Sequence, residues 1–240
     1  MQASYSEYDY TASLTRIDEL LAGSDASYTE STGIPGRENL TFTNGYYVDV
    51  TVLFIDMRGS KSLADKHTRP VLAKIYRAYI SELVAVLRGN PKISEIYIEG
   101  DGVWAVFDTR TKPEVDAAFQ SAYTAASLID ILNIKLTKKG YSTVSVGMGL
   151  DDGESLYIKA GYKGSGINEV VWLGRVVGQA SALCKNGNRT FLDREIMVSS
   201  RVYDNLNDHN KSLLVWSPER SCYHGNVVHT GMNYWVDANA

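Results

Sequence analysis

Residues 47–62, YVDVTVLFIDMRGSKS, contain a nearly unbroken run of β-branched and aromatic side chains that stops at Asp56. A run that is apolar on both faces is typical of a central strand and unlike the alternating pattern of an edge strand. The RGSKS stretch behind it is polar and rich in small residues. The sequence therefore predicts a buried strand that ends in a loop leading into a helix.

Helical and strand patterns alternate after this strand. Pro70 opens a helix of about five turns, because apolar side chains recur there every three or four residues. Residues 93–107, ISEIYIEGDGVWAVF, have the composition of a β-hairpin with Asp101 at its tip. Thr111 and Glu114 have the spacing of a capping box at the start of a second long helix.

The rest of the chain continues in the same style, without an internal repeat. We expect strands at 142–150 and 156–162, a helix at 174–184, a strand and a helix within 196–206, and a last strand at 227–236. The order predicts an α+β domain with helices on one face of a mostly antiparallel sheet. Residues 1–46 are expected to form a helix at 10–22 and a polar linker, and residues 47–240 the main domain.

Composition excludes several classes of protein. The formal net charge of −4 gives no overall positive field for a nucleic acid or an anionic membrane. The N-terminus has no signal-peptide pattern, and no window of about 18 apolar residues predicts a membrane span. Cys184 and Cys222 are too few for a disulfide framework, so we expect reduced thiols in a cytoplasmic protein.

Two carboxylates stand out by their positions. Asp56 ends the central strand, and Asp101 lies at the tip of the hairpin expected beside it. Neighbouring carboxylates with no basic residue in either strand repel, and a divalent cation such as Mg²⁺ or Mn²⁺ relieves the repulsion. The alternative is that one aspartate caps a helix and the other occupies a turn. The loop at Arg58, Gly59 and Ser60 favours the metal, because its N–H groups can hold a phosphate.

Four stretches resemble the ordered motifs of class III nucleotide cyclase catalytic domains: FIDMRGSKSLAD, IYIEGDGVWAVF, VSVGMGLDDG and WLGRVVGQASAL. The resemblance covers about residues 47–237 and implies a ferredoxin-like βαββαβ sheet. It also implies that Asp56, the carbonyl of Met57 and Asp101 hold two divalent ions, Mn²⁺ or Mg²⁺. The triphosphate of the substrate is then expected on the turn from Arg58 to Ser60.

The sequence departs from this family where the base and the ribose are recognised. Adenylate cyclases usually have Lys, and guanylate cyclases Glu, four residues before the hairpin aspartate, whereas this chain has Tyr97. The second purine-reading position is Val171, which has no polar group. The usual ribose Asn and transition-state Arg correspond to Gly178 and Ala182. Arg175, on the same helical face, is the candidate for the catalytic arginine.

The expected metal ligands are present, whereas the residues at the base-reading positions differ from those of purine cyclases. This combination indicates a substrate with a base other than a purine. The whole chain resembles the pyrimidine cyclases of bacterial Pycsar antiphage systems, which make cyclic UMP or cyclic CMP to activate a separate effector protein. The resemblance implies conversion of UTP to 3′,5′-cyclic UMP and pyrophosphate by two-metal phosphoryl transfer. Tyr97 would bound the base pocket.

The resemblance also implies a head-to-tail homodimer, because sites in this family form between two catalytic domains. The helix at 10–22 either extends that interface or packs on its own domain. Three other functions stay open: a cytidylate cyclase, with Glu99 accepting from the cytosine amine if it faces inward; an adenylate or guanylate cyclase; and a catalytically silent cyclase-like module. The diguanylate cyclases are a poor match, because the hairpin tip reads EGDG.

Overall fold

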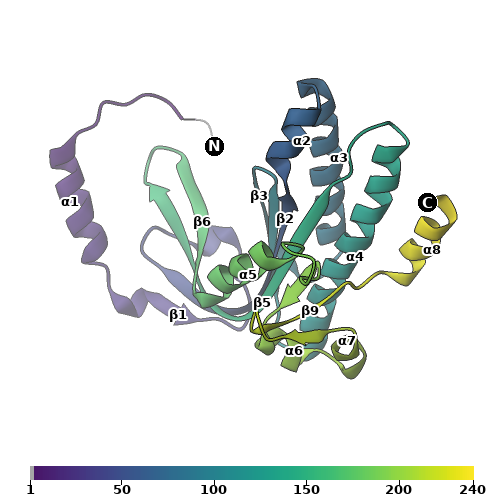
Figure 1. The fold of residues 1–240 in the computed structure, drawn as a ribbon. Coiled ribbons are helices and arrows are strands. Elements are labelled where there is room, and N and C mark those ends of the chain that lie inside the picture. The colour runs from purple at the N-terminus through teal and green to yellow at the C-terminus, as the bar shows by residue number, and fades with distance from the viewer. Residues whose placement is uncertain (1–2) are drawn as a thin grey trace. The chain divides into compact units, whose positions relative to one another are not determined.

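The apolar run lies within β2 (Gly45–Arg58), which has paired neighbours on both sides, as expected for a central strand. The computed structural model describes residues 3–240 (Figure 1). Two units are distinguished along the chain. The first comprises the chain up to Asp49 together with Glu154–Gly174, and the second comprises Val50–Gly153 and Arg175–Ala240.

The sheet of the second unit has the strand order β3-β4-β2-β5-β7-β9-β8. Its other strands are β3 (Ile93–Glu99), β4 (Gly102–Asp108), β5 (Ser145–Tyr162), β7 (Ile196–Val198), β8 (Val215–Ser217) and β9 (Cys222–Gly225). β3 and β4 form the predicted antiparallel hairpin, and β4 also pairs antiparallel with β2. β7 pairs parallel with β5.

Two long helices, α3 (Arg69–Arg88) and α4 (Lys112–Thr137), cover one face of this sheet (Figure 1). Alternate residues of β2, among them Leu53 and Ile55, are fully buried against them. The capping box at Thr111 and Glu114 is confirmed at the start of α4. The shorter helices of this unit are α2 (Ser60–Lys66), α6 (Ser200–Asn205), α7 (Asp208–Ser212) and α8 (Thr230–Asn239).

The helix α5 (Arg175–Asn186) lies on the second face of the sheet. Val146, Met148 and Leu150 of β5 belong to the core under α3 and α4, so the intervening residues point the other way. Those residues include Gly149, where an added Cβ would overlap the backbone of α5 at Ala180 and Cys184. Glycine therefore permits the close approach of α5 to the sheet.

The first unit contains α1 (Tyr10–Leu21), β1 (Tyr28–Glu30), β6 (Ile167–Leu173) and two short 3-10 helices, at Asp25–Ser27 and Arg37–Asn39. β1 pairs parallel with the start of β2, and β6 pairs antiparallel with the end of β5. The polar stretch expected to be a linker thus contains a strand. No residue of α1 is fully buried, and the Arg16 guanidinium of this helix lies 4.9 Å from the ring centroid of Tyr162 in β5.

Two expectations about secondary structure are wrong. The strands expected at 142–150 and 156–162 form one continuous strand, β5, and its hairpin partner β6 was not predicted. The last strand expected at 227–236 is largely the helix α8, which contacts α4. The aromatic and β-branched composition favoured a strand. The His229 side chain, however, accepts from the N–H of Met232 and caps the helix.

Both cysteines, Cys184 and Cys222, are buried free thiols. Within residues 3–240, every helix is too short or too polar to cross a lipid bilayer.

The contact between α5 and the sheet can be tested at Gly149. We expect Gly149→Ala to lower the free energy of unfolding by about 1–3 kcal/mol, because the added methyl group has no room beside the α5 backbone. Gly178→Ala is the matched control: its Cβ meets open space, and alanine stabilises a helix by about 0.5–1 kcal/mol over glycine. Urea denaturation measures both, and equal midpoints would contradict the packing.

Candidate active site

The register between β2 and β4 places the two predicted aspartates together. Asp56 pairs with Gly102, the first residue of β4, and Asp101 directly precedes it at the hairpin tip. Asp56 is half-buried, and Asp101 is partly exposed. The expectation that the end of the strand and the tip of the hairpin are neighbours is confirmed.

The environment of Asp56 opposes its negative charge. Burial raises the pKa of the Asp56 carboxyl, the charge of Asp101 raises it further, and the Arg58 guanidinium acts in the opposite direction. Ionised carboxylates in such a position favour a bound cation, because its charge offsets both burial and repulsion.

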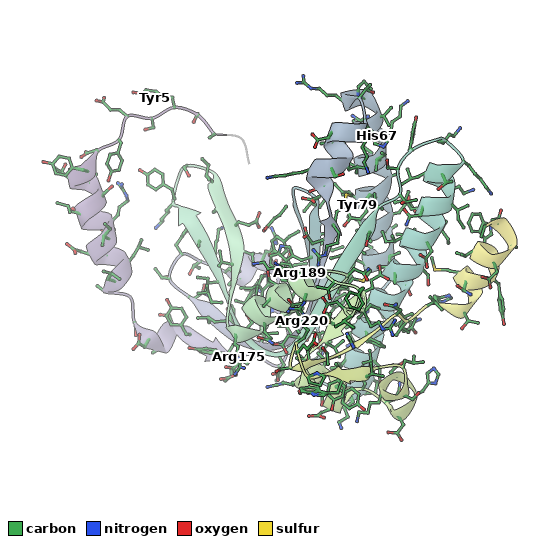
Figure 2. All side chains as sticks on the ribbon, in the orientation of Figure 1. Tyr5, His67, Tyr79, Arg175, Arg189 and Arg220 are labelled. Atoms are coloured by element: carbon green, nitrogen blue, oxygen red, sulfur yellow. The ribbon has the colours of Figure 1, made fainter. Side chains whose placement is uncertain are left out.

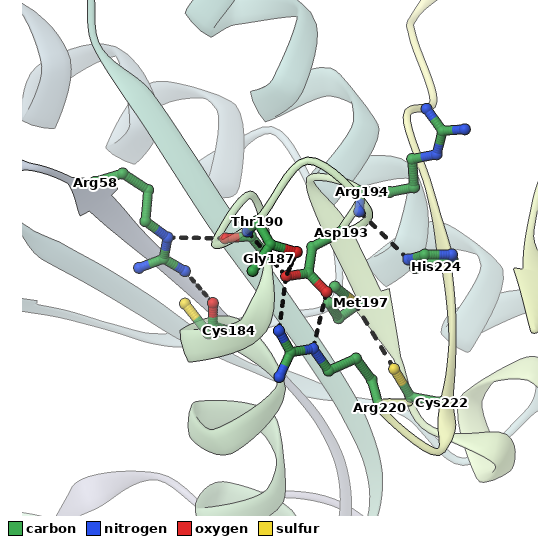
Figure 3. Close-up of polar contacts among 10 residues, drawn as sticks. All are labelled: Arg58, Cys184, Gly187, Thr190, Asp193, Arg194, Met197, Arg220, Cys222 and His224. Carbon is green, nitrogen blue, oxygen red and sulfur yellow. Dashed lines mark hydrogen bonds and ion pairs between the residues drawn. The ribbon is translucent and has the colours of Figure 1, made fainter. Parts of the chain in front are cut away.

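Arg58 belongs to the same strand and was expected only as part of the phosphate-binding turn. Its Nη1 donates to Oδ2 of Asp56 at 2.9 Å. Its Nε donates to the Gly187 carbonyl at 2.8 Å, and its Nη2 donates to the Cys184 carbonyl (Figure 3). The premise that neither strand contains a basic residue is therefore wrong. The guanidinium is therefore held by groups of its own chain.

The turn after β2 exposes its backbone. Gly59 adopts a left-handed conformation with φ of 68°, and an added Cβ there would meet open space. No side chain caps the start of α2, so the first N–H groups of that helix have no side-chain partner. Ser60 is hydrogen-bonded to Tyr76 of α3. This turn is accessible to an anion, and its role in phosphate binding stays a prediction.

An aromatic stack crosses three strands on the face opposite α3 and α4. Phe54 of β2 stacks on Trp104 of β4, with ring centroids 5.0 Å apart and planes 8° apart. Tyr97 of β3 stacks on the other side of Trp104 at 4.1 Å and 13°. Alternation along β2 also places Asp56 on this face. The predicted base-reading residue thus shares a face with a predicted metal ligand.

Arg175 is not near the aspartates of its own chain. It is the exposed first residue of α5 (Figure 2), whereas Cys184, near the other end of that helix, contacts Arg58. Cys184 lies nine residue positions after Arg175 along the helix, which corresponds to a rise of about 14 Å. Gly178, at the expected ribose position, is exposed. A single chain therefore does not bring Arg175 together with Asp56 and Asp101.

The model of the adenylate and guanylate cyclase catalytic domain matches residues 42–235. This chain belongs to that family. Uridylate cyclase from Gulbenkiania mobilis is 36% identical over 259 residues, covering 100% of both chains. Uridylate cyclase from Treponema porcinum is 32% identical over 235 residues, covering 96% of this chain and 82% of that one.

The fold agrees with this membership. The crystal structure of the adenylyl cyclase CyaB from P. aeruginosa matches with a TM-score of 0.63 and 19% identity, over 72% of this chain and 85% of that chain. The expected class III cyclase fold is therefore confirmed.

Cyclases of this class use divalent metal ions, and the residues present fit such ions. Asp56 and Asp101 are hard oxygen ligands, and Met57 lies between Asp56 and the turn. No group of three or more His, Cys, Asp or Glu side chains suited to a metal occurs in residues 3–240. Two carboxylates suffice when water and substrate phosphates complete the shell, as Mg²⁺ often requires. The metal role of these residues stays a prediction.

Two tyrosines of α3 lie within electrostatic range of Asp56 and Asp101, and the sequence did not single them out as site candidates. Tyr79 is fully buried, its hydroxyl has no hydrogen-bond partner, and burial and the charges of Asp56 and Asp101 raise its pKa (Figure 2). Burial and the same two charges also raise the pKa of Tyr76. The helical periodicity after Pro70 predicts an apolar helix face but gives no signal that carboxylates lie near Tyr79.

The loop after α5 supports the carbonyl that binds Arg58. Arg220 donates to both oxygens of Asp193 at 2.8 Å, and Thr190 donates its N–H and hydroxyl to the same carboxylate (Figure 3). These bonds, led by the one from Arg220, lower the pKa of the Asp193 carboxyl to about 2. The ion pair thus fixes the loop that carries Gly187.

The Asp193–Arg220 pair predicts an acid-sensitive contribution to stability. The folded-state pKa is below the unfolded value, so this contribution is complete above about pH 4 and is lost as the pH falls towards 2. We expect Asp193→Asn to lower the free energy of unfolding at pH 7 by about 2–3 kcal/mol and to flatten its decline between pH 4 and 2. Exposed Asp65→Asn is the control. Unfolding curves at several pH values test this, and an unchanged acid limb in Asp193→Asn would contradict it.

Proposed function

We propose that this chain is a pyrimidine nucleotide cyclase that converts UTP into 3′,5′-cyclic UMP and pyrophosphate. The observation that carries the proposal is the combination of the Asp56–Asp101 pair with Tyr97 at the base-reading position. The full-length likeness to uridylate cyclases supports uracil as the base. Tyr97 supplies neither the ammonium nor the carboxylate usual at this position in purine cyclases.

The reaction is an intramolecular phosphoryl transfer. The ribose 3′-oxygen forms a bond to the α-phosphorus, the bond from that phosphorus to pyrophosphate breaks, and the hydroxyl proton passes to water. Asp56, Asp101 and the Met57 carbonyl hold two divalent ions, Mn²⁺ or Mg²⁺. When bound, these ions lower the pKa of the 3′-hydroxyl and neutralise the leaving pyrophosphate. The backbone N–H groups of Gly59 and Ser60 orient the triphosphate.

The active form is a head-to-tail homodimer, in which Arg175 comes from the partner subunit. Its distance from Asp56 along α5 of one chain supports a site shared between two chains. Arg175 stabilises charge that develops around the α-phosphate, a role that replaces the arginine absent at Ala182. Two equivalent sites follow from the symmetry of the dimer.

The product is a second messenger of antiphage defence in the cytoplasm, where a separate effector protein binds it. The alternative substrate is CTP, which would use the carboxylate of Glu99. Glu99 lies on the same face as Tyr97 and Trp104, where a carboxylate can accept a hydrogen bond from the cytosine amine of CTP.

Product analysis tests the activity and the base. We expect the purified chain, incubated separately with ATP, GTP, CTP and UTP in Mn²⁺ and then Mg²⁺, to form cyclic UMP from UTP. Asp56→Ala and Asp101→Ala should each abolish the product without loss of fold, because each removes a metal ligand; Asp65→Ala is the control. Mass spectrometry identifies the product. Cyclic CMP, AMP or GMP alone would replace the assigned base, and no product from any nucleotide would favour a silent module.

Mixing two inactive variants tests the shared site. We expect Asp56→Ala and Arg175→Ala each to be inactive alone. After subunit exchange, half of the dimers contain both variants, and each of these has one intact site, so about a quarter of the unmodified activity should return. Mixing Asp56→Ala with Asp101→Ala is the matched control, because both substitutions affect the metal ligands of one chain. Equal activity in the two mixtures would contradict a contribution of Arg175 in trans.

A further inference from the structure

Glu99 lies on the sheet face that carries the stack of Phe54, Trp104 and Tyr97. The proposed metal site does not account for its position there. Gly102 of β4 pairs with Asp56 on one side and with Glu99 on the other. Two strand spacings separate the backbones of Asp56 and Glu99, which is about 10 Å. Among residues 3–240 there is no three-acid group that would make Glu99 a third metal ligand. Its carboxylate is therefore available for a different partner.

Trp104 fixes the position of this carboxylate. The indole Nε1–H of Trp104 donates to Oε1 of Glu99 at 3.2 Å. The indole ring is itself held between Phe54 and Tyr97. Glu99 is exposed, and its Oε2 makes no hydrogen bond to the described part of the chain. One carboxylate oxygen is thus anchored to a rigid aromatic stack, and the other is directed to a ligand or to water.

The stack leaves ring edges open for a ligand. The rings of Phe54, Trp104 and Tyr97 are nearly parallel and stack from one strand to the next. Their faces are therefore turned towards one another, and their edges point away from the sheet. A base cannot enter between rings that are 4.1 and 5.0 Å apart. It can lie beside Tyr97, with its own edge towards Glu99. The carboxylate accepts hydrogen bonds and donates none, so it selects a base edge with an N–H group.

We propose that Glu99, positioned by Trp104, is a specificity-determining residue that accepts a hydrogen bond from N3–H of the uracil ring. This inference rests on the proposed function and deepens it. Uracil has a donor at N3, whereas cytosine has a lone pair there that a carboxylate repels. A site built to hydrogen-bond a donor discriminates strongly against an analogue that lacks it.

The test compares kcat and KM of the full-length chain for UTP, CTP and 3-methyl-UTP, which lacks the N3–H. We expect Glu99→Ala to lower kcat/KM for UTP by about tenfold or more, mainly through KM, because a hydrogen bond to a charged group is lost. The preference for UTP over 3-methyl-UTP should shrink in the same variant. Trp104→Phe keeps a ring in the stack but removes the indole N–H, so a smaller change in the same direction is expected. Exposed Glu82→Gln is the control.

Three results would overturn the inference or its foundation. An active chain whose Glu99→Ala and Glu99→Gln variants keep the UTP kcat/KM and the discrimination against 3-methyl-UTP would exclude Glu99 from base recognition. A loss confined to CTP would assign Glu99 to the cytosine amine instead. If the unmodified chain forms no cyclic product, the proposed cyclase function is wrong, which is a different result from the exclusion of Glu99. Equilibrium binding of UTP and 3-methyl-UTP to the unmodified chain and to Glu99→Ala then decides the base contact without turnover.

Discussion

The close placement of two like charges at the end of a buried strand is the constraint on which this site depends. The antiparallel register fixes Asp56 opposite Gly102, so the side chain of Asp56 cannot move away from the hairpin tip without breaking the ladder. Arg58 offsets part of the repulsion, and its guanidinium is held by carbonyls of α5 and the following loop. Gly147 makes this possible, because a Cβ there would overlap the guanidinium.

The two faces of the sheet have different physical roles. One is covered by α3 and α4 and contains the fully buried side chains of β2, β4 and β5. The other has α5 over β5 and an aromatic stack over β2, β4 and β3. Because strand residues alternate between faces, a single strand supplies both core and site: Ile55 is buried under the helices, and its neighbours Phe54 and Asp56 serve the second face. Neighbouring residues of β2 therefore alternate between the packed core and the proposed site.

The distribution of functional groups over α5 explains why a second copy is central to the proposed mechanism. The end of this helix near Cys184 helps to hold Arg58, which is paired with Asp56 of the proposed metal site in the same chain. The other end presents Arg175 to solvent. A rigid helix cannot bring both ends to one point, so the same element serves two sites when two copies associate head to tail.

The central strand, the hairpin with Asp101 at its tip, the two long helices and the resemblance to a class III cyclase could all be predicted from the sequence. These follow from local periodicity, capping and turn chemistry, which depend on neighbouring residues. The sequence pattern misassigned residues 227–236, because aromatic and β-branched residues suit a strand or a helix packed on α4 equally well. Three features could not be predicted from the sequence: the ion pair of Arg58 with Asp56, the Phe54–Trp104–Tyr97 stack and the contact between Trp104 and Glu99. The ion pair depends on β2 continuing as far as Arg58, and the other two features join side chains on different strands. The register and packing of the sheet bring these side chains together, and a local sequence pattern contains no information about either.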